Sequence, residues 1–186
     1  MTKMILQDQA AGLRNLVSFR AADSARVFTI AGGTTRVGKT SVAVNLATAL
    51  AKNGQRVLLI DENPCHNSIC TNLGLQARFD LLHVINKDKK LNQVLLQGPE
   101  NITILSAMRG IHTLNKLNSH EQNWLIKSFS ELTETVDIVL IDTAMSGATH
   151  VLPLSLASEQ VIIVISGSAA SLTGAYALIK ILSQEY

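Results

Sequence analysis

Short apolar runs alternate with amphipathic stretches from residue 26 onward, and this alternation is the main structural signal in the chain. Apolar runs bounded by polar positions are typical of buried parallel strands. We expect five such strands, at Val27–Ala31, Arg56–Ile60, Ile102–Leu105, Asp137–Ile141 and Val161–Ile165. The pattern predicts an α/β fold: a doubly wound, mostly parallel sheet with helices on both faces and its ligand at the carboxyl ends of the strands.

Apolar positions at helical spacing predict helices between these strands. The first covers Thr40–Asn53, where the Asn-Gly pair at 53 and 54 supplies a C-terminal stop. A capping-box pattern, Ser119-His-Glu-Gln122, predicts a helix start before Trp124. The last helix is expected from about Ser171 to Leu182.

The N-terminal residues predict a separate element. Leu6, Ala10, Leu13 and Val17 recur at helical spacing, so residues 5–17 should form a short amphipathic helix. Residues 18–25 have no apolar period and read as a tether. We therefore expect an N-terminal helical arm and tether over residues 1–25 and a main domain over 26–186. A helix that packs on its own domain is equally compatible with the pattern.

Composition narrows the class of protein. Hydrophobic residues make up 47% of the chain and aromatic residues only 4%, so the core must consist mainly of Ala, Val, Ile and Leu. The net charge is only +2 and the sequence contains no long block of basic residues, so we expect no direct nucleic-acid partner. Neither a secretory signal nor a membrane-spanning stretch is visible, which predicts a cytoplasmic protein. Cys65 and Cys70 flank His66, but unpaired thiols are a simpler reading than a metal site.

A phosphate-binding pattern follows the first strand. Residues 33–40 read GTTRVGKT and fit G-x-x-x-x-G-K-[ST], between a predicted strand and a predicted helix. Backbone N–H groups of such a loop surround phosphates, and Lys39 supplies a positive charge for the outer oxygens. A glycine-rich turn with a solvated lysine would not explain the Lys-Thr pair at the helix start. We predict that the following residues bind a nucleoside triphosphate: Gly33, Thr34, Thr35, Arg36, Val37, Gly38, Lys39, Thr40 and Ser41.

Two aspartates complete the candidate site. Asp61 and Asp142 each follow a buried apolar strand, so both should emerge at the carboxyl edge beside the P-loop. A carboxylate there is costly to desolvate unless a cation or hydrogen-bond donors lie nearby. Either aspartate alone is as readily a helix cap or loop residue. The pair, together with the Thr40 hydroxyl, predicts a Mg²⁺ site.

Several motifs, taken in order, resemble one known family. They are Asp8-Gln9-Ala10-Ala11-Gly12-Leu13-Arg14, the P-loop, VAVNLA from Val42, VLLID ending at Asp61, Asn72-Leu-Gly-Leu75, LIDTA at 140–144 and Ala175-Tyr-Ala-Leu-Ile-Lys180. The chain resembles the MinD/ParA group of P-loop ATPases over essentially its whole length, and within that group the flagellar-number regulators of the FlhG (FleN) type.

The resemblance implies ATP and Mg²⁺ as cofactors, an ATP-dependent homodimer, and a C-terminal membrane helix that holds the protein peripherally at the inner membrane. It also implies that the N-terminal arm acts on an FlhF-like GTPase, through Asp8, Gln9, Leu13 and Arg14. This chain stops at Tyr186, before the expected membrane helix, which indicates a truncated or incomplete product.

Two departures from the family pattern bear on hydrolysis. The family usually has a lysine where this chain has Thr34, and that lysine reaches the nucleotide of the partner subunit. The second aspartate of the family, which positions the attacking water, is here Asn63, and an amide cannot accept the proton of that water. The resemblance assigns Lys39, Asp61 and Asn63 as the catalytic set, with slow ATP turnover unless Arg36 substitutes for the missing lysine.

Three other functions stay open. The first is a catalytically impaired module that binds nucleotide but does not hydrolyse it. The second is a partitioning ATPase, disfavoured by the modest charge and by the arm motif. The third is an amidotransferase-like or synthetase enzyme, for which the sequence offers no substrate pocket.

Overall fold

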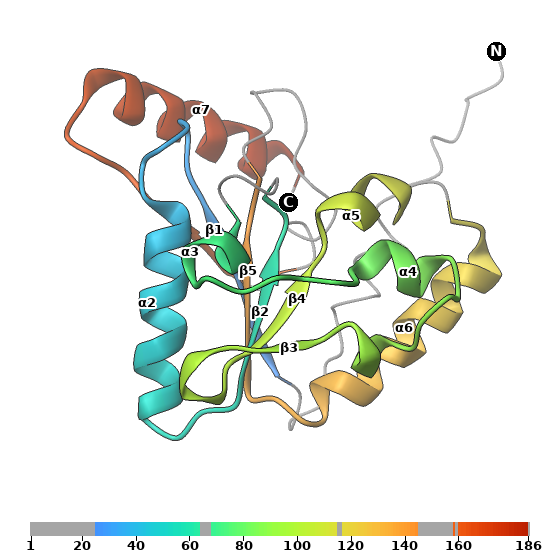
Figure 1. The fold of residues 1–186 in the computed structure, drawn as a ribbon. Coiled ribbons are helices and arrows are strands. Elements are labelled where there is room, and N and C mark those ends of the chain that lie inside the picture. The colour runs from blue at the N-terminus through green and yellow to red at the C-terminus, as the bar shows by residue number, and fades with distance from the viewer. Residues whose placement is uncertain (1–24, 64–67, 115–116, 145–157, 159, 186) are drawn as a thin grey trace, which may run out of the picture.

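A computed structural model describes residues 25–63, 68–114, 117–144, 158 and 160–185. Within these ranges the strands form one sheet in the order β3-β4-β2-β5-β1-β6 (Figure 1). Their bounds are β1 Arg26–Ala31, β2 Val57–Asp61, β3 Leu96–Gln97, β4 Thr103–Ser106, β5 Ile138–Asp142 and β6 Gln160–Ile163. All neighbouring strands are parallel except β3 and β4, which are antiparallel.

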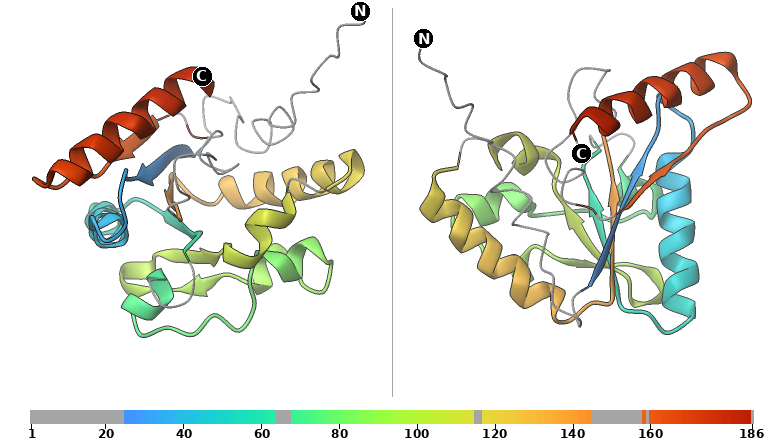
Figure 2. Two further views of the ribbon diagram at one scale, coloured as in Figure 1. Left: turned by 90° about the horizontal axis from the view of Figure 1, so that it is seen from above. Right: turned by 180° about the vertical axis from the view of Figure 1, so that it is seen from behind.

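Helices cover both faces of the sheet, as Figure 2 shows. The helices are α2 Lys39–Lys52, α3 Ile69–Asn72, α4 Leu81–Ile85, α5 Met108–Leu114, α6 Ser119–Thr133 and α7 Ala169–Glu185, with 3₁₀ turns η2 at Leu91–Gln93 and η3 at Pro99–Asn101. Because successive strand residues point to opposite faces, the apolar strands feed two separate cores. One core joins the sheet to α2 and α3, and the other joins it to α4, α5 and α6.

The predicted fold class is confirmed: the sheet is mostly parallel and has helices on both faces. Each of the five expected strands is present, with bounds that differ by one or two residues. The segment between β2 and β4 holds more structure than predicted, namely α3, α4 and the short antiparallel β3. Two to five residues are too few to show a hydrophobic period, so the sequence pattern did not reveal them.

The N-cap of α6 lies one residue before the predicted cap. Asn118, not Ser119, is the N-cap: its side-chain oxygen accepts hydrogen bonds from the backbone N–H groups of His120 and Glu121. The Glu121 carboxylate in turn accepts from the backbone N–H of Asn118. A glutamate in this position also interacts favourably with the positive end of the helix dipole, which Gln122 cannot do. The predicted capping box is therefore present, but it is formed by Asn118 and Glu121, one residue earlier than predicted.

The predicted N-terminal arm lies outside the described residues, and so do its partner-binding candidates Asp8, Gln9, Leu13 and Arg14. Among the residues that the structure describes, no helix is both long enough and apolar enough to cross a membrane.

Candidate functional site

The loop between β1 and α2 has the backbone geometry of a tight phosphate-binding turn. Gly38 has φ 98° and directly precedes the first residue of α2, where the backbone N–H groups of the helix are free to bind a ligand. Arg36 has φ 58°, a left-handed conformation that costs roughly 1 kcal/mol for a residue other than glycine. The chain thus keeps the loop shape although Arg36 stands where a glycine would adopt it without strain.

The base of the loop is held by two close approaches. A Cβ atom on Gly32 would lie 2.7 Å from Cγ1 of Val37, so only glycine fits under the loop. A Cβ on Gly33 would overlap the backbone of Gly174 in α7, and a Cβ on Gly174 would overlap the backbone of Gly33. Helix α7 therefore packs backbone to backbone against the loop (Figure 1).

A cavity of about 550 Å³ opens beside the loop. Seven of its lining residues were predicted to bind nucleotide: Thr35, Arg36, Val37, Gly38, Lys39, Thr40 and Ser41. The other three are Asn63, Asn72 and Ala144. Two predicted members, Gly33 and Thr34, are not part of this lining. The sequence reading noted Asn72 only as part of a family motif and did not assign it or Ala144 to the site.

Lys39 is the one lysine among the described residues that line the cavity, and it is almost fully enclosed, with 8% of the residue exposed. Burial lowers the pKa of its ammonium group, and the nearby Asp142 carboxylate raises it again in part. An enclosed ammonium group beside free helix N–H groups is suited to bind a polyanion, because both offer positive charge to the same anion.

Asn63 connects the ends of two neighbouring strands. Asp61 and Asp142 are directly paired in the register of β2 and β5. The Asn63 side-chain amide donates to Oδ2 of Asp142 at 2.8 Å and, more weakly, to Oδ1 of Asp61 at 3.4 Å. It also donates to the backbone carbonyl of Asp142 at 3.2 Å. The predicted water-positioning residue therefore already has both amide hydrogens engaged by the two carboxylates.

Both carboxylates are buried, and burial dominates their protonation. It raises the pKa of Asp142 to about 7, although the Thr40 hydroxyl and Lys39 lower it in part and Asp61 raises it further. The pKa of Asp61 is also raised by burial, against hydrogen bonds from the backbone N–H groups of Asn63 and Ile69. The second of these, from Ile69 to Oδ2, is 2.6 Å long. Neither aspartate lines the cavity itself, but both contact residues that do: Asn63 donates to each carboxylate, and the Thr40 hydroxyl interacts with that of Asp142.

The chemistry of these groups fits a hard cation. Oδ1 of Asp142 is fully buried and has no hydrogen-bond partner among the described residues. The Thr40 hydroxyl interacts with the same carboxylate. These are oxygen ligands of the kind that Mg²⁺ takes, usually with phosphate oxygens and waters. Among the described residues, no group of three or more His, Cys, Asp or Glu side chains is placed so that it could hold a metal ion.

Glu62 is a third buried acid that the sequence reading missed. It is 1% exposed, and neither carboxylate oxygen has a hydrogen-bond partner of normal geometry in the described part of the chain. Burial raises its pKa to about 8; the backbone N–H of Ala144 lowers it slightly, whereas Asp142 and Asp61 raise it. The available signal was its position directly after a fully buried strand. Cys70 is a free, buried thiol whose pKa burial raises to about 11, while Cys65 and His66 lie outside the described residues.

Comparison with known proteins gives consistent relatives. The chain is 35% identical to the antiactivator FleN of Pseudomonas aeruginosa over 161 residues, which are 87% of this chain and 58% of FleN. It is 25% identical to the flagellum site-determining protein YlxH of Helicobacter pylori over 96% of this chain and 63% of that protein. The chain thus spans less than two thirds of the length of these relatives.

Solved structures share the fold. The MinD cell division protein of Aquifex aeolicus superimposes with a TM-score of 0.68 at 25% identity, over 87% of this chain and 65% of that one. Cobyrinic acid a,c-diamide synthase of Mycobacterium smegmatis, solved with a bound ATP analog and magnesium, gives a TM-score of 0.69 at 23% identity over 86% and 68%.

The model of the AAA domain family AAA_31 matches residues 25–185, which begin with β1 and end with α7. The matched range contains the loop, Lys39, the bridged aspartates and every described strand. With its P-loop, its parallel sheet and its MinD and FleN relatives, the chain belongs to this family and is a P-loop ATPase domain of the MinD/ParA type.

Proposed function

We propose that the chain binds ATP with Mg²⁺ at the loop between β1 and α2 and serves as a nucleotide-dependent regulator of flagellar number or placement. One observation supports the binding site above all others. The enclosed Lys39 lines a cavity together with Asn63, which is hydrogen-bonded to two buried carboxylates, and one carboxylate oxygen has no hydrogen-bond partner among the described residues. A buried arrangement of this kind lowers the stability of the ligand-free protein, because charges removed from water lose hydration free energy that no partner replaces.

The residues have distinct roles in this proposal. The loop N–H groups and Lys39 bind the phosphates, and Thr40, Asp61 and Asp142 hold Mg²⁺, which neutralises charge on the phosphate oxygens when bound. Asn63 holds the two aspartates together. Because its amide is engaged by both and cannot accept a proton, hydrolysis is slow, and the chain works mainly through its nucleotide-bound and nucleotide-free forms.

The regulatory role rests on the relatives. FleN is an antiactivator and YlxH determines the flagellum site, so a flagellar role is the function that these names favour. We propose an ATP-dependent homodimer as the active form. We also propose that the N-terminal arm, with Gln9 as its main contact and Asp8, Leu13 and Arg14 beside it, acts on an FlhF-like GTPase. In the full-length protein, we propose peripheral attachment to the inner membrane.

Calorimetry with ATP and with GTP, each with and without Mg²⁺, tests the binding site. We expect the wild type to bind ATP, and Lys39→Ala to weaken binding by about 10- to 100-fold, because a charged hydrogen bond to phosphate contributes about 1.5–3 kcal/mol. Lys52→Ala is the matched control: this lysine lies on the same helix, is exposed, and sits at the opposite end. Equal binding by wild type and Lys39→Ala would exclude the proposed site.

Phosphate release from ATP tests the slow turnover. We expect little release by the wild type at saturating ATP, and turnover typical of an efficient ATPase would contradict the role given to Asn63. A pull-down of an FlhF-like GTPase with wild type and with Gln9→Ala tests the arm separately. If Gln9→Ala retains the GTPase as well as the wild type does, the arm is not the contact.

A further inference from the structure

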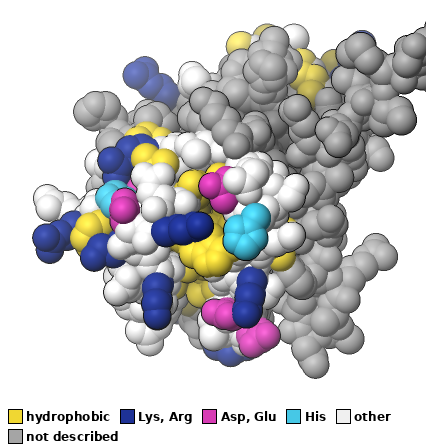
Figure 3. Space-filling model, turned by 90° about the vertical axis from the view of Figure 1, so that its right-hand side faces the viewer, with side chains coloured by type: hydrophobic (Ala, Val, Ile, Leu, Met, Phe, Trp, Pro, Cys, Tyr) yellow, Lys and Arg dark blue, Asp and Glu magenta, His cyan; other side chains and the backbone are white. Residues whose placement is uncertain are grey.

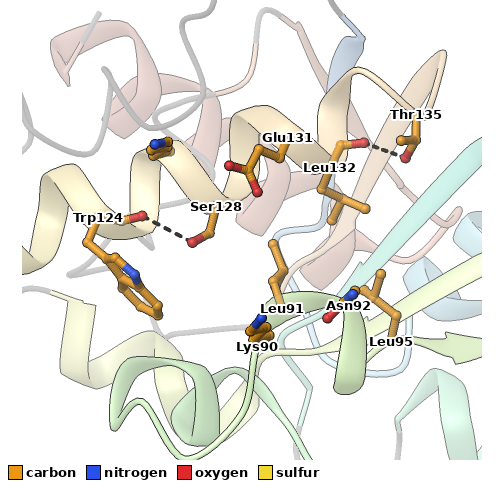
Figure 4. A pocket seen from close by; sticks show the side chains of 10 residues that line it. Lys90, Leu91, Asn92, Leu95, Trp124, Ser128, Glu131, Leu132 and Thr135 are labelled. Carbon is orange, nitrogen blue, oxygen red and sulfur yellow. Dashed lines mark hydrogen bonds between the residues drawn. The ribbon is translucent and has the colours of Figure 1, made fainter.

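A groove lies on the side of the molecule away from the nucleotide cavity, between α6 and the η2 turn. It has a volume of about 690 Å³ and is lined by Lys90, Leu91, Asn92, Leu95, Trp124, Lys127, Ser128, Glu131, Leu132 and Thr135. No residue of this lining belongs to the nucleotide cavity. Figure 4 shows the Trp124 and Leu132 side chains on the α6 wall and Leu91 and Leu95 on the opposite wall.

The groove follows one face of a helix. Its α6 residues are spaced by three, one, three, one and three positions, which is the repeat of a single helical face and its continuation past the C-terminus. From residue 124 to residue 135 this face extends about 16 Å. An apolar groove of that length and direction suits a second helix of about three turns, laid along α6.

The floor of the groove is apolar and is formed by side chains that belong to the hydrophobic core or pack against it. Leu91 is buried in the core beneath α6, and Leu95, Trp124 and Leu132 pack against that core while staying partly exposed. The two hydroxyl groups of the lining are already satisfied by their own helix: Ser128 donates to the Trp124 carbonyl at 3.1 Å and Thr135 to the Leu132 carbonyl at 2.7 Å. Apolar side chains of an occupant would therefore meet little unsatisfied polar surface on this floor.

The rim carries three charged side chains that form no ion pair within the described part of the chain. Lys90 and Lys127 are exposed on the two sides of the groove, Glu131 is exposed one turn beyond Lys127, and none of the three forms an ion pair with any described residue. Lys87 and Lys89 precede Lys90 in the same segment, with the exposed Asp88 between them, so the segment carries three positive charges and one negative charge. Figure 3 shows a yellow apolar area on this side of the molecule, with dark blue Lys and Arg side chains around it and fewer magenta Asp and Glu and cyan His side chains among them.

We propose that this groove is a docking site for an acidic amphipathic helix of a partner protein. Leucine-like side chains of that helix fill the floor between Trp124, Leu91 and Leu132, and a carboxylate lies between Lys90 and Lys127. Aromatic residues at the edge of an apolar groove often carry a large share of the binding energy, which assigns that role to Trp124. The charges on the rim select an acidic helix over a basic one.

Trp124 makes the proposal directly measurable, because it is the only tryptophan in the chain. The probe is a synthetic amphipathic helical peptide that contains Leu on one face, Glu on the flanks and no tryptophan. A second peptide with Lys in place of each Glu is its charge-reversed match. Each is titrated into the nucleotide-free full chain while tryptophan fluorescence is recorded. We expect a saturable change with the Glu peptide and at least about tenfold weaker binding of the Lys peptide.

Variants of the protein locate the response. Lys90→Glu combined with Lys127→Glu is expected to weaken the Glu peptide by at least about tenfold and to favour the Lys peptide instead. Lys180→Glu, an exposed lysine on α7, is the matched control and should bind as the wild type does. All substituted positions are exposed, so folding should be retained, and circular dichroism checks this.

Three results would overturn the proposal. The first is the absence of a saturable change with the Glu peptide. The second is equal binding of the two peptides, or of wild type and the double variant, which would show apolar adsorption without charge selection. The third is a response to vesicles of anionic phosphatidylglycerol but not to the peptide, which would make this face a membrane contact. Because the titration contains no nucleotide, its outcome is independent of the ATP-binding test.

Discussion

Strands β2 and β5 are neighbours along their whole length, yet their two ends place charged side chains in different surroundings. Just before the strands begin, Arg56 and Asp137 form an ion pair of 2.6 Å in solvent, with 59% and 35% of their side chains exposed. Where the strands end, Asp61 and Asp142 are buried side by side with a single amide between them.

The difference separates a structural pair from a binding site. Opposite charges in solvent need no further partner, and their net contribution to stability is small. Two like charges in the interior destabilise the free protein, because desolvation is not repaid by their neighbours. A chain that keeps the second arrangement at the end of its central strands gives up stability there, and binding of a cationic partner would recover it.

The largest effect on stability is expected from Glu62→Gln at the buried end. The folded-state pKa of Glu62, about 8, lies above its ordinary value of 4.5. The folded state therefore holds this proton more tightly, and wild-type stability falls as pH rises from about 5 to 8. Gln stays neutral, so the variant should exceed the wild type by on the order of 4 kcal/mol at pH 9.

Urea denaturation of both proteins at pH 5, 7 and 9 measures this difference. It should shrink steadily toward pH 5. A difference that does not change with pH would show that Glu62 does not titrate as a buried acid.

Asp142→Asn should act in the same direction with a smaller stability gain. Its folded-state pKa of about 7 lies above the ordinary 3.8, so ionisation costs stability between about pH 4 and 7. Because Asn63 stabilises the carboxylate, we expect a gain on the order of 2–3 kcal/mol at pH 8. Thermal unfolding should also show that Mg²⁺ adds less to the stabilisation by ATP in this variant than in the wild type, because one of the three proposed protein ligands is lost. A Mg²⁺ effect as large as in the wild type would remove Asp142 from the metal site.

Asn63→Asp sharpens the comparison by adding a third carboxylate to the buried end. The change removes the two amide donors and places a further charge beside Asp61 and Asp142. We expect a loss of about 1–3 kcal/mol for the free protein at pH 8. Asn63→Ala, which removes the donors without adding charge, is the control and should lose less. In Mg²⁺ and ATP the Asp variant should regain more stability than the wild type and release phosphate faster.

The smallest effect is expected at the solvent end. Arg56→Ala breaks the exposed ion pair, but the Asp137 carboxylate is solvated and keeps the hydrogen bond from the backbone N–H of residue 56. The melting temperature should therefore fall less than for Asn63→Asp, and ATP affinity should not change. High salt should abolish even this small difference, because it screens the exposed pair. A loss comparable to that of Asn63→Asp would mean that the two strand ends do not differ as described.

Five of the six described strands were readable from the sequence because they are largely apolar runs in a sheet covered on both faces, whereas the two-residue β3 shows no such run. The same logic placed Asp61 and Asp142 at one edge together with Lys39, as the structure has them. The contacts of Asn63 were not readable, since they depend on its side chain reaching from the end of β2 to the end of β5. The groove beside α6 was equally hidden, because its opposite wall comes from the η2 segment, which has no periodic pattern.

The contact between Gly33 and Gly174 has a mechanical consequence. Glycine inside a helix costs about 1 kcal/mol relative to alanine, yet α7 has one where its backbone meets the loop. With only hydrogen atoms between them, the two segments have no slack, so neither can shift alone without a clash or a gap. A displacement of the loop therefore requires α7 to tilt or slide with it. Movement of α7 at the outer surface of the molecule would report movement of the phosphate-binding loop.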